Sequence, residues 1–264
     1  MTQSIAQKPV REIMNVTHKQ LLTPHYIRVY LTGQADTIAN IATMTVGANN
    51  KLAIPVDKTQ PLDLTDPSSF VMRTYTHRGV DTQKQHIWID FVAHGDEAPA
   101  SGWATHAEVG DEIGVMMKPK NKALCPAADS FLLVGDATAI PVLGAILESL
   151  PASATGHCII EVHGKEDEQA LSTAANIEMT WLHNPHPEQG SQLLDTVKSL
   201  ALPNAEQSRF AYIASEFSSV KALRHYLKVE QQWSKDELYA FSYWKAGVAE
   251  DQSANDRKAE KDKD

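Results

Sequence analysis

Short segments that alternate apolar and polar positions fill the first half of the chain. The stretch "HYIRVYLTG" at residues 25–33 alternates in this way and stops at a glycine, as a half-buried strand does. Similar segments, separated by turn residues, occupy residues 51–56, 70–76, 86–95 and 108–117. Several short strands at this spacing are typical of a small antiparallel barrel or sandwich. We therefore predict an N-terminal antiparallel β-barrel domain over residues 1–125, ended by the bend "LCPAAD".

The second half alternates strand-like and helical segments. "FLLVG" at residues 131–135 is a continuous apolar run, and Ile140, Leu143 and Leu147 then recur at helical spacing. Further strand-like segments lie at 157–163, 178–183, 210–215 and 238–244, and helical ones at 191–200 and 218–230. This alternation predicts a doubly wound parallel α/β domain over residues 126–248, similar to nucleotide-binding domains.

Two further features of the second half concern helix ends and the chain end. Val220, Leu223 and Leu227 form one apolar stripe, and Ser218 or Ser219 is positioned to cap that helix. Residues 249–264 are charged and almost lack large apolar side chains. Such a segment cannot bury enough apolar surface to order itself. We expect it to be a disordered tail.

Composition narrows the class of protein. The 264 residues are 42% hydrophobic, enough for a core and for two domains. The formal charge of −9 opposes a nucleic-acid-binding surface. The N-terminal residues have no apolar core long enough for a signal peptide, and no apolar run reaches membrane-spanning length, so we expect a cytoplasmic protein without a membrane partner. Cys125 and Cys158 stand outside any metal-binding spacing.

The stretch "FVMRTYTHRGVD" at residues 70–81 contains an unusual density of polar groups for a strand. Arg73, Tyr75, Thr76 and Arg78 stand within six positions. A strand that only covers a core does not need them, whereas a planar or anionic ligand does, because guanidinium groups bind phosphate in forked geometry.

Two more segments are candidate ligand sites. "GDATAIP" follows the first strand of the α/β half, where Asp136 and Thr138 could face a ligand at a helix start or could simply cap the helix. "DFVAHGDEAPASGWA" ends a strand at His94 and begins a helix whose Ala100 and Ser101 would let a diphosphate approach backbone amides. Alone, His94 is more often structural and Trp103 more often part of a core.

In combination, these segments resemble a known family. "RTYT", "DFVAHG", "PASGWA", "LLVGDATAIP" and "SYWKAG" occur in the order seen in siderophore-interacting proteins, which are FAD-binding relatives of the ferredoxin–NADP reductases. The resemblance runs from about Val10 to Gly247. It implies non-covalent FAD as the cofactor and reduction of a ferric siderophore, which releases iron as Fe(II).

The resemblance also implies roles for particular residues. Arg73 would face the cofactor phosphate, Tyr75 would pack on the isoalloxazine ring, and Thr76 would hydrogen-bond the flavin edge. Arg78 could be either a ligand contact or a solvated charge at the strand end. The implied cofactor-binding set is Arg73, Thr74, Tyr75, Thr76, Asp90, Phe91, Val92, His94, Ala100, Ser101, Trp103, Asp136, Thr138 and Ala139, the last three at the place where the two domains meet. Lys51 and Lys245 match basic positions for an anionic siderophore. Lys118, Lys120 and Lys122 are the candidates for a third member, and Lys120 is the one we select.

The electron donor and the reaction itself each have more than one candidate. The segment that would hold a pyridine nucleotide lacks a glycine-rich fingerprint, so NADH, NADPH and a ferredoxin are all possible electron donors. A general flavin oxidoreductase and a non-catalytic siderophore-binding protein are the rival functions. No side-chain catalyst is required, because the flavin performs the redox chemistry. His183 and His186 lack a third ligand for a metal. We expect a monomer.

Overall fold

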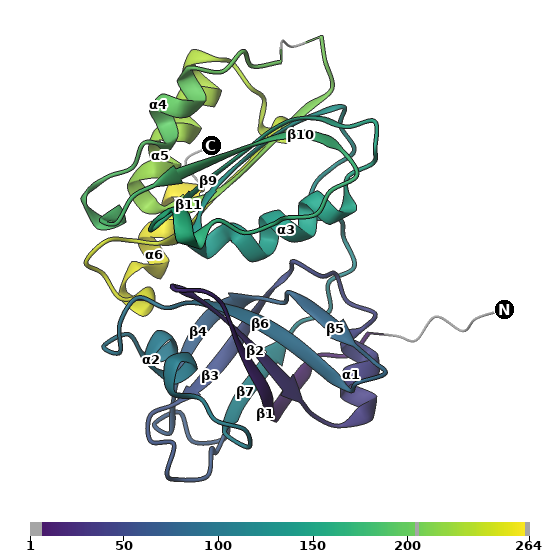
Figure 1. Cartoon of the computed structure of the whole chain (residues 1–264), viewed down its shortest axis with the longest axis vertical. Coiled ribbons are helices and arrows are strands. Elements are labelled where there is room, and N and C mark those ends of the chain that lie inside the picture. The colour runs from purple at the N-terminus through teal and green to yellow at the C-terminus, as the bar shows by residue number, and fades with distance from the viewer. Residues whose placement is uncertain (1–6, 204–205, 262–264) are drawn as a thin grey trace, which may run out of the picture. The chain divides into compact units, whose positions relative to one another are not determined.

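The computed structural model describes residues 7–203 and 206–261 (Figure 1). The chain divides into two compact units, Met1–Leu124 and Cys125–Asp264, called here the first and the second unit. Among the described residues, none of the helices combines the length and the apolar character needed to cross a membrane.

The first unit is a curled antiparallel sheet with two short helices. Its elements are β1 (Val10–Thr23), β2 (Tyr26–Thr32), α1 (Ala35–Ile41), β3 (Asn49–Pro55), β4 (Phe70–Thr76), β5 (Gly79–Asp81), β6 (His86–Val92), α2 (Pro99–His106) and β7 (Glu112–Met117). The strands pair in the order β4-β3-β7-β1-β2-β6-β5. Figure 1 shows that the sheet is strongly curled. The predicted β-barrel is thus confirmed as a half-barrel.

The core of this unit follows the alternation seen in the sequence. On β2, Ile27, Val29 and Leu31 are buried, whereas Arg28 and Tyr30 between them are partly exposed. Strand β1 escaped the prediction because most of its side chains are polar. It forms because it pairs with both β2 and β7, so the neighbouring strands satisfy its backbone.

The second unit is a five-stranded parallel sheet with helices. The elements are β8 (Ser130–Asp136), η1 (Ala137–Ala139), α3 (Ile140–Ser149), β9 (Thr155–Val162), η2 (Lys165–Asp167), β10 (Asn176–His183), η3 (Pro187–Gln189), α4 (Leu193–Lys198), β11 (Arg209–Glu216), α5 (Phe217–His225), η4 (Tyr226–Glu230), η5 (Lys235–Glu237), β12 (Leu238–Trp244) and α6 (Glu250–Lys261). The strand order is β10-β9-β8-β11-β12, and each adjacent pair is parallel.

Helices cover both faces of this sheet. Figure 1 shows α3 on one side and α4 and α5 on the other. Leu132 and Val134 of β8 pack in one cluster with Val197 of α4 and Leu223 of α5. The predicted doubly wound α/β fold is therefore confirmed. The strand order reverses direction between β8 and β11, where sheets of this kind place ligands at their carboxyl ends.

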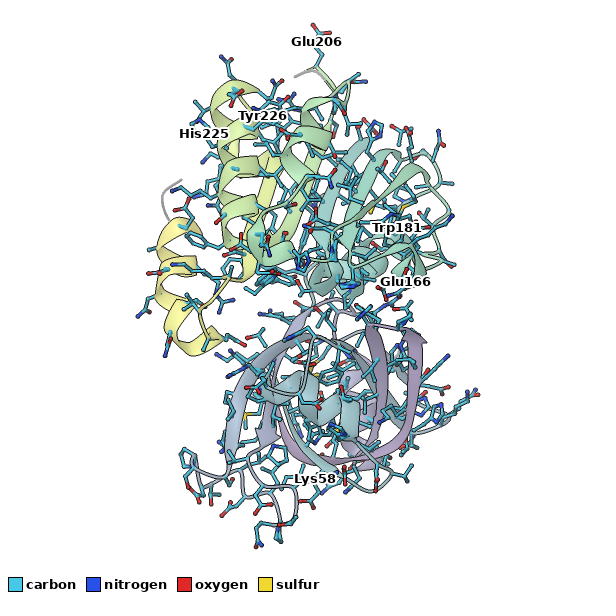
Figure 2. The ribbon with its side chains drawn as sticks, turned by 60° about the vertical axis from the view of Figure 1, so that its left-hand side comes forward. Lys58, Glu166, Trp181, Glu206, His225 and Tyr226 are labelled. Carbon is cyan, nitrogen blue, oxygen red and sulfur yellow. The ribbon has the colours of Figure 1, made fainter. Side chains whose placement is uncertain are left out.

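The start of α5 differs from the prediction. Glu216, rather than Ser218 or Ser219, is the capping residue, because its carboxylate accepts hydrogen bonds from the amides of both serines. A carboxylate also suits the positive end of the helix dipole. At its other end, α5 continues into the π-helical turn η4, and Figure 2 labels His225 and Tyr226 at that transition.

The predicted disordered tail is wrong for Glu250–Lys261, which forms α6. Ser253 and Arg257 are buried, and the Arg257 guanidinium donates to the backbone carbonyl of Tyr243 at 2.7 Å. Hydrogen bonding by arginine therefore orders a segment that has few apolar side chains. Residues 262–264 of the predicted tail lie outside the described residues.

Candidate cofactor and substrate site

Strand β4 carries four of the predicted cofactor ligands, residues 73–76, at one edge of the half-barrel sheet. Its only neighbour in the described strand order is β3, with Arg73 opposite Leu52 and Tyr75 opposite Asn50. Because paired residues share a face, Arg73 and Tyr75 lie on the face of the buried Leu52 and Asn50. Both side chains are half-buried.

The intervening threonines lie on the opposite face of the same strand. Thr74 is opposite Lys51, and Thr76 is opposite Asn49. The Lys120 ammonium group donates a hydrogen bond to the Asn49 side-chain oxygen. Burial and the charge of Lys118 lower the pKa of Lys120. The structure thus brings the predicted substrate lysines Lys51 and Lys120 to the face that carries Thr74 and Thr76.

A series of aromatic contacts connects three elements of the first unit. The ring centroid of Tyr75 on β4 lies 4.5 Å from that of Phe91 on β6, which lies 5.8 Å from that of Trp103 on α2. Phe91 is fully buried and Trp103 nearly so, so they support Tyr75 from within the core. Tyr75 is half-buried, which suits a ring that packs on a planar ligand.

Helix α2 is tied to the end of β6. The His94 amide donates to the Ser101 hydroxyl at 2.9 Å, and Ser101 is 1% exposed. A Cβ at Gly102 would lie 2.6 Å from the backbone oxygen of Asp96, so glycine permits this close approach. Ala100 and Ser101 stand in the first helical turn, where amides have no partner within the helix and suit a phosphate.

Asp90 has a different environment from its neighbours in the predicted set. Its carboxylate accepts two hydrogen bonds from Arg28, at 2.6 Å from Nε and 2.8 Å from Nη2, and its side chain is 1% exposed. The pair joins β2 to β6. Asp90 therefore stabilises the pairing of β2 with β6 through Arg28. Val92 is half-buried at the end of β6 and lies closer to α2 along the chain.

Asp136 lies at the carboxyl edge of the parallel sheet, where both oxygens of its carboxylate accept hydrogen bonds. Its side chain accepts from the Thr138 amide and hydroxyl, from Ser215 Oγ at 2.9 Å and from Trp244 Nε1 at 2.8 Å. Burial raises the pKa of Asp136, and these hydrogen bonds oppose the rise. The structure thus brings together the ends of β8, β11 and β12 around one carboxylate. Ala139 beside it is fully buried.

Two more buried carboxylates occupy the same edge, and sequence reasoning missed Glu161. Glu161, opposite Asp136 in the strand register, accepts from Asn184, Ser191 and the Gln192 amide. Its position at the end of a strand was the available signal. Glu216 caps α5 and also accepts from the Ala246 amide at 3.2 Å. Lys245, the other predicted substrate residue, directly precedes Ala246.

Comparisons with known proteins agree with this geometry. Residues 15–123 match the family model "Siderophore-interacting FAD-binding domain", and residues 128–247 match "Siderophore-interacting protein". The ferric vibriobactin reductase ViuB of Vibrio cholerae is 30% identical over 226 residues, which are 86% of this chain and 78% of that protein. The chain belongs to the siderophore-interacting protein family.

Solved structures support the same family and its wider fold. The siderophore-interacting protein SipS from Aeromonas hydrophila is similar with a TM-score of 0.81 and 29% identity, over 94% of this chain and 97% of that one. A ferredoxin NADP+ reductase from Neisseria gonorrhoeae shares the fold with a TM-score of 0.63 at 12% identity, over 88% and 98% of the two chains.

FAD is the cofactor of this siderophore-interacting protein. The family match assigns FAD to residues 15–123, the range that contains β4, β6 and α2. The described residues fit the group: a half-buried tyrosine and an arginine share one face of an edge strand, and a helix begins with small residues closely packed on the end of β6.

Proposed function

We propose that this protein is a cytoplasmic FAD-dependent ferric-siderophore reductase. The observation that carries the proposal is the match of both halves of the chain to siderophore-interacting family models, together with 30% identity to a ferric vibriobactin reductase over 226 residues. A ferric acinetobactin reductase of Acinetobacter baumannii is also similar, at 28% identity over 180 residues that cover 68% of this chain and 62% of that protein.

The first unit supplies the side chains that hold FAD. Arg73 binds a cofactor phosphate, Tyr75 packs on the flavin ring from the support of Phe91, and Thr76 hydrogen-bonds the flavin edge. The first turn of α2, with Ala100 and Ser101, receives the diphosphate through backbone amides. Thr74, Val92 and His94 complete the contacts, while Asp90 and Trp103 hold β6 and α2 in position.

The bound flavin would supply the redox chemistry, since it accepts two electrons and passes them on singly. The residues of this chain bind and orient the reactants. Lys51 and Lys120 on one face of the half-barrel sheet, and Lys245 after β12, attract an anionic ferric chelate despite the net charge of −9. NAD(P)H is the proposed electron donor, with a ferredoxin as the second candidate.

Reversal of two of these charges tests the substrate assignment. Replacing Lys51 and Lys245 together by Glu should raise the KM for an anionic ferric chelate at low salt and leave bound FAD unchanged. Added salt should narrow the difference from wild type, because screening acts within about 10 Å at 0.1 M. Iron reduction is measured by trapping Fe(II) with a chromogenic chelator.

The matched control makes the same two Lys-to-Glu replacements at other surface positions. Lys84 and Lys235 are exposed, and their replacement by Glu should change the KM far less. Loss of FAD from the Lys51→Glu/Lys245→Glu variant would assign these lysines to the cofactor. An unchanged KM at low salt would mean that the substrate binds elsewhere.

A further inference from the structure

Lys245 is engaged by a carboxylate of the C-terminal helix. Lys245 Nζ lies 2.6 Å from Asp256 Oδ2, and the same ammonium group lies 4.9 Å from the centroid of the Phe217 ring. The side chains of Lys245 and Asp256 are 30% and 56% exposed. The ion pair is therefore in reach of solvent and of a dissolved anion.

Two buried arginines anchor α6 to the end of the parallel sheet. Arg257 donates to the Tyr243 carbonyl at 2.7 Å, and Arg224 donates to the carbonyls of Ala240 at 2.7 Å and Glu260 at 2.9 Å. Both arginines are less than 10% exposed (7% and 5%). Since Asp256 directly precedes Arg257 in the helix, this anchoring sets the position of its carboxylate.

The connection between β12 and α6 reverses the chain tightly. Gly247 has φ +70°, a left-handed conformation that glycine adopts at little cost. Lys245 pairs with Val248 in an isolated bridge, and Glu216 accepts from the Ala246 amide. The backbone on both sides of the ion pair is thus held, so the pair can open by side-chain rotation without loss of α6.

We propose that Asp256 is a specificity-determining residue, which occupies Lys245 as a built-in competitor for anionic substrate groups. This inference rests on the proposed function, which assigns Lys245 to the ferric chelate. An anionic catecholate or carboxylate group of a chelate must displace the Asp256 carboxylate to reach the ammonium group. A neutral chelate does not have to displace the Asp256 carboxylate. Asp256 therefore reduces the advantage of anionic chelates over neutral ones at this position.

Binding of redox-inert probes tests the inference without turnover. The probes are a trianionic gallium(III) tris-catecholate and a neutral gallium(III) tris-hydroxamate, titrated against the FAD-loaded protein at low salt. Asp256→Asn should bind the anionic probe about two- to five-fold more tightly than wild type, in line with the strength of exposed ion pairs. Its affinity for the neutral probe should not change. Added salt should reduce the gain.

A double-mutant cycle separates direct competition from a general change in charge. In a Lys245→Gln background, Asp256→Asn should give no gain, because the group for which it competes is absent. Asp195→Asn, an equal charge change at an exposed position of α4, should also give no gain. A gain that persists without Lys245, or no gain in the wild-type background while Lys245→Gln weakens binding, would overturn the role of Asp256.

The proposed function has a separate readout. Wild-type protein that binds the gallium probe but does not reduce the matching ferric chelate would contradict the reductase and leave the competition intact. Wild-type protein that reduces the ferric chelate, with identical probe affinities for wild type and Asp256→Asn, would contradict the inference alone.

Discussion

The two units use their conspicuous polar residues in different ways. On the edge strand β4 of the first unit, Arg73 and Tyr75 are half-buried and share one face of the sheet. At the carboxyl edge of the second unit, Asp136, Glu161 and Glu216 are buried. Their carboxylates accept hydrogen bonds from neighbouring loops and strand ends.

We interpret this difference as one between candidate ligand-binding side chains and side chains that stabilise the fold. A buried carboxylate whose oxygens already accept protein donors stabilises the local backbone, and removing it leaves those donors unsatisfied. A half-buried arginine on an edge strand is exposed enough to reach a ligand. Within the first unit, two arginines have different partners: Arg28 donates to the buried Asp90 carboxylate, and Arg73 donates to the backbone carbonyl of its neighbour Met72 at 2.8 Å.

The largest expected effect concerns these two arginines. Arg28→Ala should strongly lower the free energy of unfolding of the FAD-free protein, because it leaves the Asp90 carboxylate buried without its partner. Breaking a fully buried pair costs about 3–5 kcal/mol, and the partial exposure of Arg28, at 21% of its side chain, places the effect toward the lower end. Denaturant titration measures it.

Arg73→Ala should weaken FAD binding more than it lowers the free energy of unfolding. Its unfolding free energy without FAD should fall less than that of Arg28→Ala, because Arg73 is half-buried and donates to the backbone carbonyl of its neighbour Met72. The Kd for FAD should rise about ten- to a hundred-fold through loss of a charged hydrogen bond to phosphate. Arg78→Ala is the control, with a much smaller change in the Kd. Equal FAD affinities for the Arg73 and Arg78 variants would remove Arg73 from the cofactor site.

The second unit offers the next effect. Asp136→Ala should destabilise the protein on the order of 3 kcal/mol, since Trp244 Nε1 and Ser215 Oγ lose their acceptor and each unsatisfied buried group costs about 1–3 kcal/mol. Thermal and denaturant unfolding measure the loss. If stability is unchanged and only FAD affinity falls, Asp136 is a cofactor ligand rather than a structural acceptor.

The stability of the first unit should depend on pH through His77. His77 is 2% exposed, and burial, with a smaller contribution from Arg78, lowers its pKa to about 4. In the unfolded chain His77 binds a proton near pH 6.5, whereas in the folded protein it does so only near pH 4. The free energy of unfolding therefore falls as the pH drops from about 6.5 to 4. The loss from this group reaches about 2 kcal/mol at pH 5.

Replacement of His77 by Leu removes the titrating group. Unfolding measured between pH 7 and 4.5 should then show a flatter profile than wild type. His225→Leu, at an exposed position (Figure 2), should leave the profile as it is. An equally steep profile in the His77 variant would assign the acid sensitivity to other groups.

The sequence was most informative where side-chain periodicity reflects burial. The alternation on β2 and the apolar run of β8 predicted two strands and the class of each sheet. Strand β1 and helix α6 were missed because backbone pairing and buried arginines, rather than apolar side chains, stabilise them. The apolar and polar periodicity of the sequence does not reveal hydrogen bonds between distant residues.

The candidate site was predictable in part for the same reason. Local motifs predicted Arg73, Tyr75 and the start of α2 as candidate ligand positions, because the residues of each motif are neighbours in the sequence. The commitments of Asp90 to Arg28 and of Lys245 to Asp256 depend on partners 62 and 11 residues away. Only the fold reveals them, as it reveals the burial of His77, a polar side chain that follows the end of a strand.

The visible spectrum of the purified protein tests the central claim most directly. The preparation should be yellow, and extraction followed by chromatography should yield FAD. Anaerobic reduction should bleach the flavin absorbance, and subsequent addition of a ferric siderophore should restore it while trapped Fe(II) appears in proportion. A colourless protein that cannot be reconstituted with FAD, or a reduced flavin that a ferric siderophore leaves unoxidised, would contradict the account.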